Sequence, residues 1–249
     1  MSHADATPRL AFAGVAFAFL VTMLGTTLPT PLYPGYQTAF GFSQLIITVI
    51  FAAYAVGVIA ALLVAGRWSD QLGRRPLLFA GLTAAALSDL VFLGAEGLSS
   101  LLAGRVLSGM SAGIFTGTAT VAVVESAPAA WKRTATFVAT AANMGGLGLG
   151  PVVAGALAEY VAWPLHLAYA VHLGLLVIAV LGVAVAAETV TRPPRIRLRV
   201  QRLKVPAEVR GVFMPAVIAG FAGFAVLGFF TATAPAFMVQ VLGHDNLLA

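Results

Sequence analysis

The 57 residues from Leu10 to Gly66, LAFAGVAFAFLVTMLGTTLPTPLYPGYQTAFGFSQLIITVIFAAYAVGVIAALLVAG, contain no Asp, Glu, Lys or Arg. A helix needs about 20 apolar residues to cross a bilayer, so this stretch is long enough for two spans and a turn. Prolines and a glycine within 29–35 mark the turn, because proline lacks a backbone donor and ends helices. The stretch therefore predicts two membrane helices, near 11–32 and 44–65.

The remainder of the chain continues this pattern. Of its 249 residues, 60% are hydrophobic and 9% are charged, and its mean hydropathy is +0.96. Soluble proteins carry about 25% charged residues, so this chain lacks the polar groups to cover a soluble surface. Long, continuous apolar runs favour helices over the alternating strands of a membrane barrel. The composition predicts an all-α membrane protein with further spans near 77–95, 100–124, 134–157, 165–187 and 212–240.

The basic residues predict how these spans are oriented, because cytoplasmic loops are enriched in Lys and Arg. Thirteen of the fourteen precede the first span or lie in 66–76, 125–133 and 188–210. The alternate loops carry none: 33–43, 96–99, 158–164 and 242–249. We therefore expect a multi-pass protein of the cell membrane with its N-terminus in the cytoplasm. After seven spans, the end of this chain is expected on the outer side.

The same distribution bears on partners. The net charge of +5 is explained by the topology of the loops, so membrane lipid is an expected partner and nucleic acid is not. The chain has no cysteine, which excludes disulfide frameworks and thiolate metal sites.

Composition also divides the chain into three parts. We expect a six-span bundle over 1–187, a basic linker over 188–210 that lies against anionic headgroups, and the first helix of a second block over 211–249. Span 1 ends TTLPTPLYPGYQTAFG and span 7 ends TATAPAFMVQVLG, with Pro29 and Pro235 at matching places. This faint repeat indicates a protein of two such halves, in which a C-terminal bundle would complete the fold.

The segment GRWSDQLGRRP at 66–76 combines two glycines, which permit a tight turn, with one acid among three bases. It resembles motif A of the major facilitator superfamily, G-x-L-x-D-r-x-G-r-[KR], and departs from it at Trp68 and Gln71. The matching residues are Gly66, Asp70, Gly73, Arg74 and Arg75. The resemblance implies a cytoplasmic gate, in which this acid helps hold two bundles together. Glu125 and Arg133 are candidates to extend the gate.

Span 4 contains Arg105, Ser108 and Gly109, which resemble the R-x-x-x-G pattern of the same family. Gly109, Gly113 and Gly117 recur every four residues and predict a stripe for close helix packing. Ser108 and Thr116 are expected to share a polar stripe with Arg105. An arginine facing lipid is costly, so we assign Arg105, Ser108 and Thr116 to the transport path.

Asp89 is the only acid well inside a predicted span. It precedes the hairpin turn near Gly97 by as many residues as Arg105 follows it, so the two are expected at similar depth. We predict a buried Asp89–Arg105 ion pair, with a proton-coupling role for Asp89 as the alternative. In the family the corresponding span is usually peripheral. His166 and His172 are expected to point to different faces, which argues against metal ligation.

Span 5 contains a glycine-rich run that begins at Asn143, which we also assign to the transport path. The run resembles motif C, the antiporter signature G-x-x-x-G-P-x-x-G-G, with Ala154 in place of the first closing glycine. The matching residues are Gly146, Gly150, Pro151 and Gly155. Physically, glycines let a neighbouring helix approach and proline bends the span. The resemblance implies export by exchange, and glycine-rich packing without antiport remains the alternative.

The family fold is two six-helix bundles, each a pair of inverted three-helix repeats, with the substrate bound between them. The resemblance therefore implies the first bundle plus one helix, truncated relative to twelve helices. The resemblance implies proton-coupled, multidrug-efflux-like export of a small-molecule substrate without a bound cofactor, the proton gradient supplying the energy.

The sequence also bears on transport in the other direction and on two other classes of membrane protein. An importer or facilitator of a sugar or metabolite stays open because span 1 lacks an acid, and so does a non-functional truncated fragment. A retinal protein is disfavoured because no predicted span contains a lysine for a Schiff base. An enzyme is disfavoured because the spans contain neither H-E-x-x-H nor a compact acidic pair.

Overall fold

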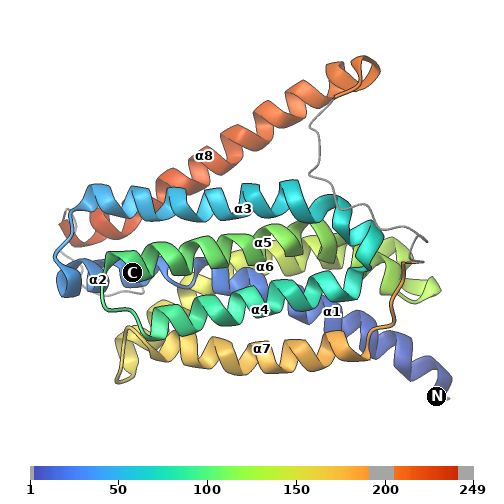
Figure 1. Cartoon of the computed structure of the whole chain (residues 1–249), viewed down its shortest axis with the longest axis horizontal. Helices are drawn as coiled ribbons and strands as arrows, with labels where there is room; N and C mark the ends of the chain where they lie inside the picture. Colours follow the sequence, from blue (N-terminus) through green and yellow to red (C-terminus); the bar gives the residue numbers. More distant parts are fainter. Residues whose placement is uncertain (1–2, 191–204, 241–249) are drawn as a thin grey trace.

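A computed structural model describes residues 3–190 and 205–240, and over these ranges the chain is entirely helical between its turns (Figure 1). The long helices are α1 (His3–Thr27), α3 (Gln44–Leu72), α4 (Arg74–Leu93), α5 (Leu98–Ser126), α6 (Lys132–Tyr160), α7 (Leu167–Val185) and α8 (Arg210–Gln240). Short elements are η1 (Thr30–Leu32), α2 (Tyr33–Phe40), η2 (Ala129–Trp131) and η3 (Ala207–Val209). Seven candidate membrane spans in the described ranges confirm the predicted all-α membrane protein.

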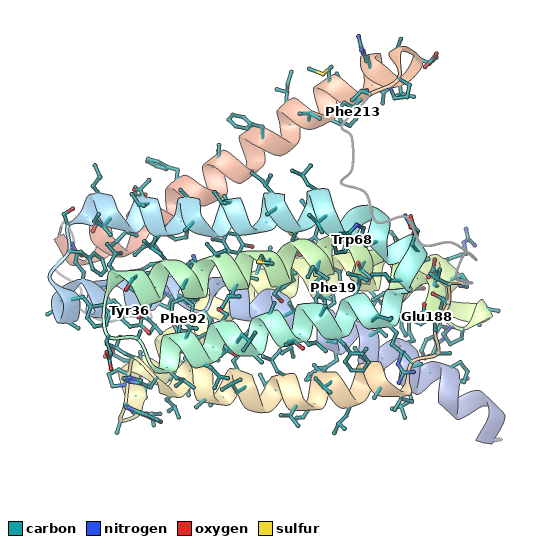
Figure 2. All side chains as sticks on the ribbon, in the orientation of Figure 1. Phe19, Tyr36, Trp68, Phe92, Glu188 and Phe213 are labelled. Carbon is teal, nitrogen blue, oxygen red and sulfur yellow. The ribbon has the colours of Figure 1, made fainter. Side chains whose placement is uncertain are left out.

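Helices α1 to α7 form one body, which we call the six-span body. Helices α1 and α5 lie at its centre: α1 packs against α5, α6 and α7, and α5 packs against α3 and α4 as well. Phe19 of α1 meets Phe115 of α5 inside this body, and Figure 2 shows Phe19 and Phe92 within it. The predicted spans 1 and 4 are therefore the most enclosed helices, whereas α3 and α6 expose more of their surface.

Glycines allow α3 and α5 to approach closely. A Cβ atom added at Gly109 would meet the backbone of Tyr54 and Val58, and one added at Gly113 would lie 2.6 Å from the Val58 carbonyl oxygen. Gly57 of α3 faces the α5 backbone in the same way. Any side chain at these positions would push the two helices apart.

Two predicted turns differ from the structure. The segment at 29–35 is not an open turn, because η1 and α2 follow α1 almost directly and carry the chain to Gly41. Prolines are tolerated there since they occupy the first turns of η1 and α2, where a backbone N–H has no helical acceptor to lose. The predicted span 44–65 agrees with the membrane-spanning part of α3, but the segment at 66–76 is mostly helical rather than an open loop: α3 runs on to Leu72, and the turn is confined to Gly73, whose φ is +108°.

Helix α8 lies outside the six-span body, and Figure 2 shows Phe213 on it, away from that body. The α8 side chains that the structure describes are exposed, among them Phe221, Phe229 and Phe230. Residues 191–204 and 241–249 lie outside the described ranges, so the predicted linker over 188–210 and the outer position of the chain end stay predictions.

Candidate functional site

Arg105 is the most deeply buried cation of the described residues. Its side chain lies in α5 with 1% of the residue exposed, and Nη1 donates to the Thr26 carbonyl oxygen at 2.6 Å. The guanidinium carbon lies 5.1 Å from the ring centroids of Phe51 and Tyr54 and 5.5 Å from that of Tyr33. Carbonyl and aromatic faces, rather than a carboxylate, stabilise this charge.

The predicted Asp89–Arg105 ion pair is wrong. The two helices do place these residues at similar depth, since Ser88 Oγ donates to the Gly104 carbonyl oxygen at 2.8 Å. The side chains nevertheless turn apart, because Asp89 faces α7 whereas Arg105 faces α1 and α3. The partner of Asp89 is His172, whose Nδ1 lies 2.7 Å from Asp89 Oδ2.

His172 was not predicted as a site residue. It is 1% exposed and Asp89 is 4% exposed, and we call these two residues the buried pair. The sequence does hold a signal for it, namely one acid and a histidine well inside predicted spans, each of which requires a polar partner in hydrocarbon. Which partner each finds depends on how the helices are rotated.

A small polar cavity adjoins the buried pair. Side chains or backbone from four helices line it: Thr22, Gly25 and Thr26 of α1, Ala85, Ser88 and Asp89 of α4, Ser108 and Ser111 of α5, and His172 of α7. Ser108 therefore faces the buried pair. Thr116, predicted on the same stripe, is exposed, and Ala112 between them is buried in the apolar core, so the predicted polar stripe is interrupted.

A second group of charged residues gathers where α3 meets α4. Arg74 Nη1 lies 2.6 Å from Asp70 Oδ1 and 2.7 Å from Ser69 Oγ, and the Arg74 guanidinium also donates to both Glu125 carboxylate oxygens at 3.4 Å. The structure thus brings Asp70, Arg74 and Glu125 together. Arg133 is exposed and has no described contact with them, and the surroundings of Gly66 lie outside what the structure describes.

Glu188 completes this group and was missed from the sequence. Its carboxylate accepts from the backbone N–H of Arg74 at 2.9 Å and of Arg75 at 3.1 Å, at the N-terminus of α4. The Arg75 side chain donates back to the Ala184 carbonyl oxygen at 2.6 Å. We call Asp70, Arg74, Arg75, Glu125 and Glu188 the turn cluster; Figure 2 labels Glu188 beside the α3–α4 turn.

Helix α6 approaches α1 through its glycines. A Cβ atom at Gly146 would lie 2.6 Å from Met23 Cβ, and one at Gly150 would meet the backbone of Leu24 and Leu28. Thr27 Oγ1 also donates to the Leu147 carbonyl oxygen at 2.9 Å. The remaining predicted residues of this region are on α6 as well: Asn143 and Pro151 are partly exposed, and Gly155 is buried.

Metal ligation finds no support in the part of the chain that the structure describes. No group of three or more His, Asp or Glu side chains lies together there. His166 stacks on Trp163 near the turn before α7, apart from His172, which faces Val21 and Asp89.

Comparisons with known proteins agree with this arrangement. A family model described as Major Facilitator Superfamily matches residues 15–249. The "Putative multidrug resistance protein MdtD" of Cronobacter sakazakii is 28% identical over 189 residues, which are 76% of this chain and 38% of that relative. The protein of the same name from Salmonella typhi is 28% identical over 193 residues, 77% of this chain and 39% of the relative. The matches thus cover less than half of each relative's length.

Proposed function

The chain belongs to the major facilitator superfamily, and on that premise we propose that it serves proton-coupled export of small molecules by alternating access. In this family a substrate site between two bundles opens in turn to either side of the membrane. The six-span body would be one bundle, and a second bundle is the expected partner. The relatives named for multidrug resistance support export over uptake.

The contact of α6 with α1 carries this proposal. Gly146 and Gly150 belong to the sequence that resembles the antiporter signature, and both seat α6 directly on the α1 backbone. At these two glycines no α6 side chain interlocks with α1, which would let one helix rock against the other. A bulkier residue at either glycine would hold the helices apart and block such a motion.

Arg105 is the residue that we propose for substrate contact. Its charge is permanent, so it cannot carry a proton itself. Its Nε has no hydrogen-bond partner among the described residues, although the atom is buried. An unpaired donor inside a membrane body is costly, and an acceptor group on a substrate would remove that cost.

Orientation is part of the proposal. The turn cluster would lie in the cytoplasm, because the basic loops alternate with loops that carry no base. Single cysteines introduced into this cysteine-free chain can be labelled from one side at a time. Arg74→Cys should react with an impermeant reagent only after the membrane is opened, and labelling of intact cells would overturn the orientation.

The test of export measures a fluorescent dye in cells that express the complete reading frame containing this chain. We expect lower dye accumulation than in control cells, and a protonophore should abolish the difference. Gly150→Ala should reduce this export, whereas Gly148→Ala should not, because a Cβ atom at Gly148 meets nothing within 4 Å. Higher accumulation in expressing cells would favour the importer, and equal effects of the two substitutions would remove the proposed role of the α1–α6 contact.

A further inference from the structure

We infer that Asp89 and His172 together form the proton-binding site of this protein, one proton being taken up and released by the pair as a unit. The inference rests on the proposed proton-coupled export and deepens it, since it names the group that carries the coupling ion. The inference follows from the hydrogen-bond geometry of the buried pair.

The hydrogen-bond geometry fixes how many protons the buried pair holds. His172 Nε2 lies 3.0 Å from the Val21 carbonyl oxygen, which can only accept, so Nε2 must carry a proton. His172 Nδ1 lies 2.7 Å from Asp89 Oδ2, and a second proton must lie between these two atoms, on either the ring or the carboxyl. The arrangement therefore holds two protons, and the pair has no net charge.

Loss of one of these two protons is unfavourable while the surroundings of the buried pair stay as they are. If a proton leaves to water, the pair becomes singly negative in a body where both side chains are almost fully buried. One ring nitrogen would then present a lone pair to an oxygen that also has only lone pairs, either Val21 O or Asp89 Oδ2. Both the buried charge and the facing acceptors raise the free energy, so loss of the proton has to be accompanied by a rearrangement.

The rearrangement would involve the helices that hold the His172 ring. A Cβ atom at Gly25 would lie 2.6 Å from His172 Nε2, so the ring rests against the α1 backbone and cannot swing toward it. The ring is also tied to α1 at Val21 and to α4 at Asp89. Release of the proton would therefore change the fit of α7 and α4 against α1, the central helix that also contacts Arg105 through Thr26.

Several other groups face the buried pair. Among the described residues, those from α1 and α5 that line the adjoining cavity are Thr22, Gly25, Thr26, Ser108 and Ser111, and Ser88 joins them from α4. None of these titrates near neutral pH. Tyr169 of α7 stacks on Phe92 one turn away, and Arg105, which donates to the Thr26 carbonyl oxygen, does not line the cavity. Proton exchange at this place thus belongs to Asp89 and His172, beside which the hydroxyl groups of the cavity lie.

The decisive experiment follows the His172 ring directly. The 249-residue chain would be prepared in micelles with ¹⁵N-labelled histidine, and His172→Gln would identify the His172 signals among the four histidines. We expect both ring-nitrogen signals to change together in one transition as the pH is raised. Asp89→Asn should remove the transition, because an amide donating to Nδ1 satisfies a neutral ring with its proton on Nε2.

Controls keep this outcome decisive. Glu96→Gln removes an exposed carboxyl group elsewhere in the chain and should leave the transition unchanged. Should Asp89→Asn not fold, Asp89→Glu retains the carboxyl group in altered geometry and should move the midpoint of the transition. The inference is overturned if the native His172 signals do not change with pH, or if they change equally in the Asp89 variants.

A transport measurement separates this inference from the export proposal. In vesicles containing the product of the complete reading frame, Asp89→Asn should keep downhill dye flux and lose its acceleration by a pH gradient. If the gradient drives dye flux in the native protein but His172 shows no transition, the proton site at the buried pair is overturned and the export proposal stands. A His172 transition without any dye flux would overturn export and leave the proton site standing.

Discussion

The buried pair and the turn cluster each link several helices through an acid, but water reaches the two acids very differently. Asp89 is 4% exposed, with His172 as its ionic partner, whereas the Asp70 side chain is 65% exposed and shares Arg74 with Glu125. Water can readily replace a lost partner in the turn cluster and far less readily around Asp89. The comparison predicts that substitutions in the interior have large effects, and that those at the helix ends have small effects that depend on salt.

The largest effect is expected at Arg105. Arg105→Ala should abolish transport while the protein still reaches the membrane, because the substitution removes the proposed substrate contact and leaves no charge behind. Arg105→Lys should restore transport only in part, since an ammonium group lacks the planar fork of donors. Dye efflux and the amount of protein in the membrane would be measured together. Normal efflux in both variants would show that Arg105 lies outside the transport path.

Removing one member of the buried pair should cost more stability than replacing both. His172→Ala leaves the Asp89 carboxyl group without its partner, and breaking a buried pair costs about 3–5 kcal/mol. Asp89→Asn combined with His172→Gln leaves two neutral amides and should be more stable than His172→Ala. Thermal unfolding in micelles would rank the variants. A double variant as unstable as the single one would show that packing, not charge, dominates here.

Gly25 offers an intermediate test, because it acts on the buried pair without removing either member. Gly25→Ala would place a methyl group against the His172 ring and should weaken the hydrogen bond to Val21. We expect a shift of the His172 ring-nitrogen signals and slower transport. Gly174→Ala is the matched control on α7, since a Cβ atom there meets nothing within 4 Å. Equal behaviour of the two variants would contradict the close fit of His172 against α1.

The smallest effect is expected at Asp70. An exposed ion pair contributes less than about 1 kcal/mol, so Asp70→Asn should leave the stability of the chain almost unchanged. In the complete protein it should slow transport without preventing insertion, if the turn cluster acts as a gate. Flux would be measured at low and high salt, and the difference between native and variant protein should shrink at high salt. Unchanged flux in Asp70→Asn at low salt would contradict the gate.

The sequence predicted the spans well because apolar length and hydrophobicity decide them almost alone. It failed where the answer depends on how helices are turned toward one another. Asp89 and Arg105 lie at matching depth, yet only the rotation of α4 about its axis decides that Asp89 meets His172.

Glu188 escaped prediction for a related reason. It lies more than one hundred residues beyond Arg74, in a segment whose many bases drew attention to lipid headgroups. Nothing local marks this carboxylate as the cap of α4. The helical continuation of α3 beyond the predicted span was missed because Gly66 and the charges at 67 and 70 look like a loop, although a helix that extends into water tolerates them.

The extra length of α3 has a mechanical consequence. Its 29 residues span about 44 Å, whereas the hydrocarbon layer is about 30 Å thick, so part of the helix extends beyond that layer. A one-residue turn at Gly73 joins this end to α4, so a displacement of the end of α3 would act directly on the start of α4. Such a displacement would tilt both helices within the membrane, while the charged residues at the turn remain in water.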